Sequence, residues 1–178
     1  MHPGRGSRHL RRGHLAEGVG IKANPWFPFV EIRPLKGQVV EAKVSPGLPQ
    51  DQILIVKSFI IPKGKDFYTI GSTYEPRFEH VEPTPEGIEN ILSYVKQGNR
   101  LSVEVVEARA SLRPTTASRR PVMGRHPQYG RLVVLNGLGT KGVLQAPWCA
   151  ERLRSWLDGE LDRLPVETDI SRFLKNFG

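Results

Sequence analysis

The sequence predicts an α+β fold with a mixed, mostly antiparallel sheet, one helix flanking that sheet, and a separate strand, glycine-rich loop and helix near the carboxyl end. Hydrophobic residues alternate with period two in several short segments, as in half-buried strands, and recur at helical spacing in two others. The 178 residues, 38% of them hydrophobic and 25% charged, suffice for one hydrophobic core and are typical of a globular protein.

The first part of the fold should be a sheet with a helix on one face. Strand patterns cover residues 37–44, 53–61, 67–73 and 101–107. The turn-forming run from Pro62 to Asp66 makes 53–61 and 67–73 an antiparallel hairpin. A helix is expected over 85–96, because Thr84 is a good N-cap and Pro85 suits the first helical position. Its buried face consists of Ile88, Ile91, Leu92 and Val95.

The second part should be a short buried strand over 131–136, a glycine loop over 137–142, and a helix that begins at Pro147 and ends at Gly159. Cys149 falls on the apolar face of that helix, which favours a buried core thiol. As the single cysteine, it excludes an internal disulfide and a Cys-rich metal site, and this fits a reducing cytoplasm.

The charge of +8 and the pI near 9.9 make a basic nucleic-acid-binding module an alternative. Half of that excess lies in residues 1–23, which lack the pattern of a signal peptide and are expected to be a basic disordered tail. The remaining basic candidates are Arg119, Arg120, Arg125 and Arg131. Apolar runs are too short for a membrane span.

Residues 137–142, Gly-Leu-Gly-Thr-Lys-Gly, match G-x-G-x-x-G between a strand and a helix. A dinucleotide-binding unit would continue into a second parallel strand with an acidic residue about 20 positions on, and no such pattern follows. The glycines can instead let backbone N–H groups approach an anionic part of a ligand at the helix start. The alternative is a tight turn with no ligand role.

Several strings resemble the carboxy-terminal signature of the D-amino-acid oxidase and glycine oxidase family. They are Ala-Ser-Leu-Arg-Pro-Thr-Thr at 110–116, Arg-Pro-Val-Met-Gly-Arg-His-Pro at 120–127, Leu-Val-Val-Leu-Asn-Gly at 132–137 and Gly-Val-Leu-Gln-Ala-Pro at 142–147. Residues 24–39 and 60–73 look like the substrate-domain strands of the same family. The resemblance covers about residues 18–174.

The resemblance implies an FAD-dependent oxidoreductase that oxidises the C–N bond of an amino acid or related amine by hydride transfer to non-covalently bound flavin. Residues 24–110 would be the substrate-binding domain and 111–178 the carboxy-terminal part of the FAD-binding domain. The family's amino-terminal Rossmann segment has no counterpart here, so this chain is expected to be truncated, inactive alone, and in need of that segment as a partner. A non-catalytic remnant of a flavoenzyme is a further alternative.

The resemblance also assigns site residues. Arg113 aligns with the family arginine that binds the substrate carboxylate, a task suited to a planar guanidinium, although a surface arginine at a strand end is the simpler interpretation. Tyr68, Thr73 and Tyr74 belong to the hairpin expected to roof the substrate pocket, where a tyrosine can also be mere packing. Thr140 replaces an arginine of glycine oxidase. The expected flavin contacts are Asn136, Gly137, Leu138, Gly139, Thr140, Lys141, Gly142 and Val143.

Neither covalent flavin attachment nor a metal site is expected. Cys149 is predicted to be a core thiol rather than a flavin anchor, and His126, before a proline in a turn, is predicted to be structural. The five histidines show no metal-ligand spacing. No catalytic acid or base is assigned, because orientation of the substrate toward the flavin carries the reaction in such enzymes.

Overall fold

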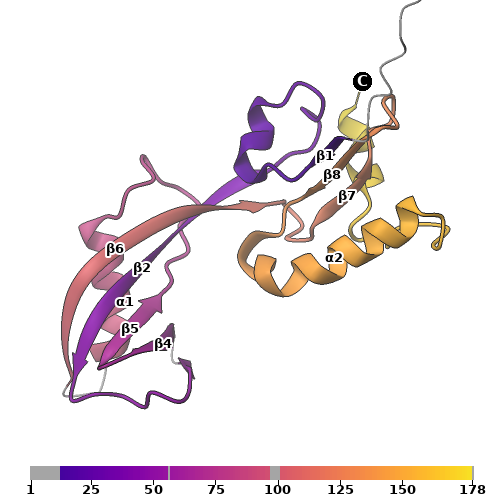
Figure 1. Cartoon of the computed structure of the whole chain (residues 1–178). Coiled ribbons are helices and arrows are strands. Elements are labelled where there is room, and N and C mark those ends of the chain that lie inside the picture. Colours follow the sequence, from indigo (N-terminus) through magenta and orange to yellow (C-terminus); the bar gives the residue numbers. More distant parts are fainter. Residues whose placement is uncertain (1–12, 56, 97–100, 178) are drawn as a thin grey trace, which may run out of the picture. The chain divides into compact units, whose positions relative to one another are not determined.

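The structure, a computed structural model, describes residues 13–55, 57–96 and 101–177 and divides into two compact units (Figure 1). One unit consists of residues Pro34–Arg113. The other combines Met1–Arg33 with Pro114–Gly178, so it is formed by both ends of the chain. Each unit has its own hydrophobic core and is described separately below.

The 34–113 unit is a five-stranded sheet with the strand order β3-β4-β5-β2-β6. These strands are β2 (Arg33–Ser45), β3 (Leu54–Ile55), β4 (Phe59–Gly64), β5 (Phe67–Gly71) and β6 (Ser102–Thr115). The pairs β3–β4, β4–β5 and β2–β5 are antiparallel. The predicted strands at 37–44, 67–73 and 101–107 thus lie in one sheet, as expected, and the pairs named here are antiparallel.

Helix α1 (Pro85–Lys96) supplies the other half of this core. Its Ile91, Leu92 and Val95 are at most 8% exposed and belong to one cluster with Val40 and Ala42 of β2. The helix therefore covers one face of the sheet, as its i, i+3, i+4, i+7 spacing predicts. Burying large aliphatic side chains of this kind stabilises a fold by roughly 1.5–3 kcal/mol each.

The predicted strand over 53–61 is wrong as a single strand. The chain folds back within it, so that Leu54 and Ile55 of β3 pair with Ile60 and Phe59 of β4. The hydroxyl of Ser58 donates to the backbone carbonyl of Gly71, which ties the start of β4 to β5. Ile55 is 81% exposed, so this end of the apolar run lies at the surface.

The other unit contains a three-stranded sheet with the order β1-β8-β7. Strand β1 (Gly13–Leu15) runs parallel to β8 (Leu132–Asn136), and β7 (Val122–Arg125) is antiparallel to β8. The helical elements are η1 (Gly18–Ala23), η2 (Gly139–Lys141), α2 (Gly142–Leu157) and η3 (Ile170–Asn176). The core around Met123, Val133 and Cys149 includes Leu153 of α2.

The predicted tail and domain boundaries need correction. Residues 13–23 are not disordered, because Gly13–Leu15 pairs with β8 and Ile21 is 1% exposed inside a core cluster. Residues 1–12 of the predicted tail lie outside the described residues. The segment 24–33 belongs to the unit of the chain ends, since Phe27 and Phe29 are buried there, so the sheet unit is 34–113 rather than 24–110.

The last helix starts five residues earlier than predicted, at Gly142, with Pro147 inside it. Pro147 has no N–H to donate to the carbonyl of Val143, which lies at the exposed start of the helix. No helix in the described parts of the chain is long and apolar enough to cross a membrane.

Candidate functional site

Arg113 lies at the end of β6 in the sheet unit, and its guanidinium is held by three oxygens. Nη2 donates to the Ser72 hydroxyl at 2.7 Å, and Nη1 donates to the backbone carbonyls of Thr73 at 3.2 Å and Lys36 at 3.5 Å. Gly37 of β2 leaves room for this arrangement, because a side chain there would occupy the space of the guanidinium. The Arg113 guanidinium is therefore held in place by residues that lie 40 and 77 positions away in the sequence.

An open cavity of about 430 Å³ lies beside Arg113 on the sheet. Its lining is formed by Gly37, Val39, Arg109, Ala110, Ser111 and Arg113. The two arginines differ in their partners: Arg109 pairs with Glu41 at 2.6 Å, whereas the hydrogen bonds of Arg113 go to neutral oxygens. Burial lowers the pKa of Arg113, opposed by the charge of Glu75, but an arginine stays protonated. The cavity thus offers a cation whose charge a carboxylate can neutralise.

A buried polar network adjoins Arg113 and was missed by the sequence reasoning. Lys36 and Gln38 are at most 1% exposed, and both contact Glu75. The amide of Gln38 also accepts from the backbone N–H of Thr84 at 2.8 Å, which caps the start of α1. The sequence did contain a signal for this network. When the period-two pattern of β2 is extended from Val40 toward the amino terminus, Gln38 and Lys36 fall on the buried face.

The three hairpin candidates occupy different environments. Tyr68 is fully buried in the core, and its hydroxyl donates to the Leu48 carbonyl at 2.6 Å and accepts from the Leu48 N–H at 2.8 Å. Thr73 is 5% exposed and its hydroxyl accepts from the Gln38 N–H at 2.9 Å. Tyr74 is 54% exposed. Tyr68 and Thr73 therefore have structural partners, and the Thr73 carbonyl rather than its hydroxyl reaches Arg113.

The glycine loop of the other unit connects β8 to α2 through two residues in the left-handed region. Gly137 has φ 70° and Gly139 has φ 58°, which glycine adopts at little cost. Asn136 is buried, and its side chain donates to the Gly18 carbonyl at 2.9 Å and accepts from the Gly137 N–H at 2.7 Å. Leu138 forms an isolated bridge with Thr115. Asn136 and Leu138 thus hold the loop in its conformation through contacts with Gly18, Gly137 and Thr115.

The remaining predicted flavin contacts lie at the exposed start of α2. Thr140 and Lys141 are exposed, and Val143 is 95% exposed. Lys141, at the N-cap position, makes no side-chain capping hydrogen bond, and the first turn of α2 contains no acidic residue. Unsatisfied N–H groups and the helix dipole favour a negatively charged ligand atom at such an end. This end of α2 is therefore suited to a negatively charged ligand atom, although the Gly137 N–H is already engaged by Asn136.

Cys149 and His126 have the structural roles that their patterns predict. Cys149 is fully buried, and burial raises the pKa of its thiol. His126 is 4% exposed, stacks edge-on with Phe27, and its Nδ1 accepts from the backbone N–H groups of Gln128 and Tyr129. Both side chains are thus part of the packed interior of this unit.

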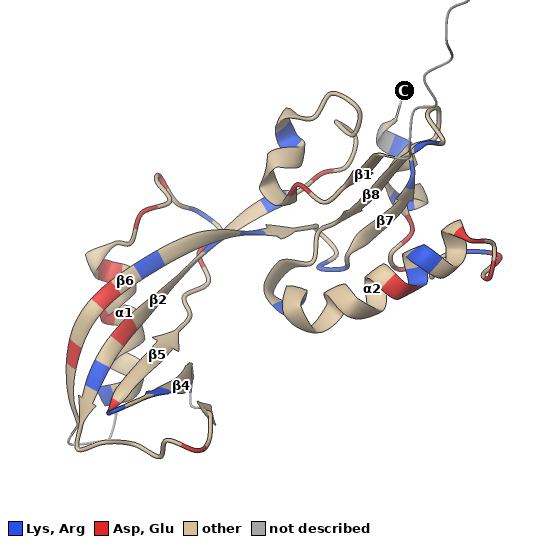
Figure 2. Cartoon of the chain, viewed as in Figure 1, with Lys and Arg blue, Asp and Glu red and all other residues tan. Residues whose placement is uncertain are grey.

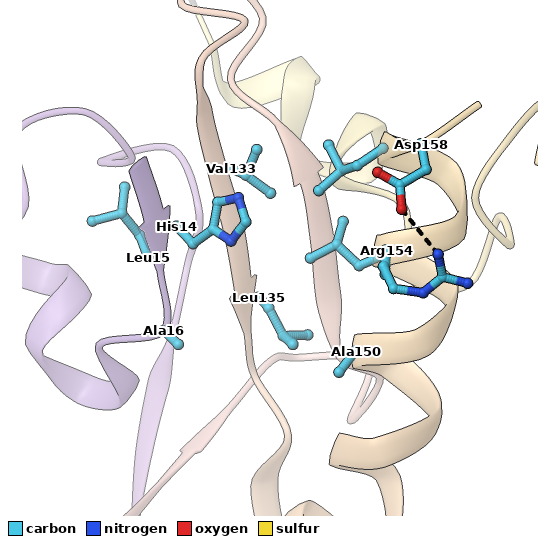
Figure 3. Close-up of a pocket in the computed structure, with 10 residues that line it drawn as sticks. His14, Leu15, Ala16, Val133, Leu135, Ala150, Arg154 and Asp158 are labelled. Atoms are coloured by element: carbon cyan, nitrogen blue, oxygen red, sulfur yellow. Dashed lines mark hydrogen bonds and ion pairs between the residues drawn. The ribbon is translucent and has the colours of Figure 1, made fainter. Parts of the chain in front are cut away.

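A separate groove of about 290 Å³ lies in the same unit as the glycine loop, between the β1–β8 pair and α2 (Figure 3). Its lining is mostly apolar, with Leu15, Val133 and Leu135 among its residues, while Arg154 and Asp158 form an ion pair at its rim. It contains none of the site residues predicted from the sequence.

Charge is mixed along the long elements of the chain (Figure 2). Strand β6 carries Glu104 and Glu107 as well as Arg109, and α2 carries Glu151 as well as Arg154. Of the basic candidates, Arg125 stacks over the Trp156 ring at 5.0 Å. Strand β6 and helix α2 therefore mix both signs of charge, whereas a nucleic-acid groove would show one sign.

Comparisons with known proteins point to one family. The family model described as "FAD dependent oxidoreductase" (DAO) matches residues 6–156. The "tRNA 5-methylaminomethyl-2-thiouridine biosynthesis bifunctional protein MnmC" of Idiomarina loihiensis is 30% identical over 93% of this chain and 27% of its own length. Glycine oxidase of Bacillus licheniformis is 28% identical over 62% of this chain and 30% of its own length.

Solved structures show the same fold. Iminodiacetate oxidase of a Chelativorans species matches with a TM-score of 0.69 and 21% identity, over 90% of this chain and 47% of that chain. Glycine oxidase of Bacillus cereus matches with a TM-score of 0.61 and 24% identity, over 77% of this chain and 38% of that chain. The chain thus spans less than half of these structures and about a quarter to a third of the curated relatives.

Proposed function

The chain belongs to the FAD dependent oxidoreductase family, and from this premise we propose that it takes part in oxidising the C–N bond of an amino acid or related amine. Bound FAD supplies the hydride acceptor for such a reaction. The observation that carries the proposal is Arg113: a half-buried guanidinium, held by neutral oxygens, beside a cavity on the sheet.

Arg113 would bind the substrate carboxylate and thereby orient the carbon that carries the amine. The bonds to Ser72 and Thr73 pre-organise the guanidinium, so less conformational freedom is lost when a carboxylate pairs with it. Tyr74, exposed next to these residues, remains a proposed substrate contact, and so does Thr140 in the glycine loop. Tyr68 and Thr73 are not proposed, because their hydroxyls are already engaged inside the unit.

The glycine loop would hold the ring end of FAD without a covalent bond. A dinucleotide site also needs a βαβ unit whose helix start binds the pyrophosphate, and the described sheet β1-β8-β7 has one parallel pair, β1–β8. We therefore expect chain 1–178 to retain little FAD and to be inactive without a complementary FAD-binding segment. A flavin absorption spectrum that persists with the protein through gel filtration would contradict this.

The experiment that tests the function supplies the complementary segment as a fusion to the amino-terminal FAD-binding part of a glycine oxidase. Truncating one partner of a buried charge pair costs on the order of 2–5 kcal/mol. Arg113→Ala should then lower kcat/KM for amino acids by about two to three orders of magnitude. Turnover of the matching amines that lack the carboxylate should fall far less.

Arg109→Ala is the matched control, because Arg109 lines the same cavity but already pairs with Glu41. This variant should change kcat/KM for both substrates by less than about fivefold, as befits an exposed ion pair. Equal losses for amino acid and amine in Arg113→Ala, with flavin content and Tm unchanged, would show that Arg113 does not bind the carboxylate.

A second candidate substrate is an aminomethyl group on a tRNA base. The observation that favours it is the similarity to proteins named for tRNA 5-methylaminomethyl-2-thiouridine biosynthesis, a nucleoside that carries a secondary amine. Together with the net charge of +8, it predicts tRNA binding that weakens steeply with salt. Filter binding of labelled tRNA between 50 and 200 mM salt, roughly the range over which phosphate contacts weaken, decides it. Binding that is absent or insensitive to salt excludes this candidate.

A further inference from the structure

Buried charge lies beside the Arg113 guanidinium. The Lys36 side chain is 1% exposed and the Glu75 side chain 24% exposed, and Lys36 Nζ lies 3.6 Å from Glu75 Oε2. The backbones of the two residues also exchange hydrogen bonds of 3.1 and 3.0 Å. Because removing an ion pair from water costs free energy, a pair in this place is poor evidence for stability alone and suggests another role.

Both oxygens of the Glu75 carboxylate have partners other than Arg113. Its Oε1 accepts from the Gln38 amide at 2.8 Å and from the Thr73 hydroxyl, and its Oε2 faces Lys36. Arg113 is anchored on the same two segments, through the carbonyls of Lys36 and Thr73. A carboxylate and a guanidinium thus lie in one cluster without being hydrogen-bonded partners in the described structure.

This separation has an electrostatic consequence. Opposite charges attract more strongly as their contact with water falls, so a Glu75 carboxylate without its cation would draw the nearby guanidinium toward it. Glu75 already acts on Arg113 through charge: burial lowers the pKa of Arg113, and Glu75 opposes that shift. An Arg113 paired with Glu75 would be neutralised and drawn away from Ser72.

We propose that Lys36 is a positioning residue: it satisfies Glu75, so that Arg113 remains on Ser72 and Thr73 with its charge available to a substrate carboxylate. The inference rests on the carboxylate role proposed for Arg113. It assigns a function to the lysine in the Lys-Gly-Gln sequence at 36–38 of β2. In this sequence Lys36 is followed by Gly37, whose lack of a side chain makes room for the Arg113 guanidinium.

The first test follows Arg113 and Glu75 directly by NMR in the isotope-labelled chain. In Lys36→Met, the Arg113 Nε–H signal should shift while the carboxyl carbon of Glu75 still titrates below the usual range of a glutamate, because Arg113 replaces Lys36 as its partner. In Lys36→Met/Glu75→Gln, the Arg113 signal should return to its wild-type position. A Glu75 titration that moves upward in Lys36→Met, with Arg113 unchanged, would make Lys36 merely structural.

The second test uses acetate as the carboxylate probe and the Arg113 Nε–H shift as the readout. Lys36→Met should bind acetate at least fivefold more weakly than the wild-type chain, and the double variant should bind it within about twofold of wild type. In Arg113→Gln, acetate should no longer cause a saturable shift of the backbone amide signals of the other residues that line the cavity, and in Arg109→Gln it should still do so. Weak binding by the double variant would overturn the proposal, since its competing carboxylate is gone.

The two proposals fail in distinguishable ways. If wild-type Arg113 does not respond to acetate, the carboxylate role fails and the positioning role falls with it. If it responds, and Lys36→Met binds acetate as well as wild type does, only the positioning role fails. Should Lys36→Met not fold, Glu75→Gln carries the test: without the competing charge, acetate should bind at least as tightly as in wild type, and a threefold weakening contradicts the proposal.

Discussion

The surroundings of Arg113 and the glycine loop are built in opposite ways. The loop is a contiguous stretch, 137–142, whose shape follows from left-handed glycines and an immediate helix start. The Arg113 surroundings combine β2, the segment 72–75 and the end of β6, which are distant in sequence. Substitutions should therefore act on the loop through backbone conformation, and on Arg113 through unsatisfied buried polar groups.

Loss of the Gln38 side chain should have the largest effect on stability. Gln38→Ala leaves the Thr84 N–H without its partner and removes one of the hydrogen bonds to the Glu75 carboxylate, at about 1–3 kcal/mol for each interaction. We expect a loss of about 2–5 kcal/mol, measured by hydrogen exchange of the sheet amides in the 34–113 unit. Gln52→Ala, at an exposed position, should stay within about 0.5 kcal/mol. A loss below about 1 kcal/mol in Gln38→Ala would mean that water replaces the network.

The Tyr68 hydroxyl gives the next largest effect. Tyr68→Phe removes the partner of the Leu48 N–H and carbonyl and should cost about 1–3 kcal/mol. In the fused enzyme, KM for the amino acid should remain unchanged, since the hydroxyl lies in the core. Tyr94→Phe, at a partly exposed position of α1, is the contrasting variant and should leave stability within about 0.5 kcal/mol. An increase of KM in Tyr68→Phe without loss of stability would restore Tyr68 as a substrate contact.

The loop side of the comparison is tested by a pair of glycines. Gly137→Ala forces an L residue to φ 70° and places its Cβ 2.7 Å from Thr116 Cγ2, so we expect a loss of about 1–2 kcal/mol or more. Gly142→Ala, at φ −55° within a helix and with its nearest neighbour at 3.5 Å, should instead stabilise by up to about 1 kcal/mol. Urea unfolding followed by tryptophan fluorescence reports this unit, because Trp26, Trp148 and Trp156 all lie in it. Equal effects in the two variants would show that loop conformation is unimportant.

The smallest effect is a pH dependence that originates at Glu75. Burial raises the pKa of Glu75, but hydrogen bonds from Thr73 and Gln38 and the charge of Lys36 outweigh it, so the folded-state pKa is lowered. Because its pKa is higher in the unfolded state, Glu75 binds a proton more readily there. Its contribution to stability is therefore complete above the pKa of an ordinary glutamate, about 4.3. That contribution is lost as the pH falls through the lower pKa of Glu75 in the folded state. Urea midpoints of wild type and Glu75→Gln should converge as pH is lowered from 7 to 3. A constant difference would exclude Glu75 as the titrating group.

Local patterns in the sequence determined much of this protein. Helix α1, the strands β2, β5 and β8, the glycine loop and the buried Cys149 follow from periodicity and from turn and cap chemistry, which act over a few residues. The resemblance in the strings from 110 to 147 identified the family that the comparisons then showed. The antiparallel pairing of β3 with β4 and the early start of α2 were missed, because β-branched composition and a proline are local signals that packing overrides.

Tertiary structure alone decided which side chains meet Arg113. Nothing local links Arg113 to Ser72, Thr73 and Lys36, since those contacts arise only when β6 and β2 lie in one sheet beside the segment after β5. The same long-range pairing gave residues 13–15 a place beside β8, although their sequence reads as part of a basic tail. The physical reason is that hydrogen bonds between distant segments depend on how the chain brings them together, whereas helix, turn and strand preferences are properties of neighbouring residues.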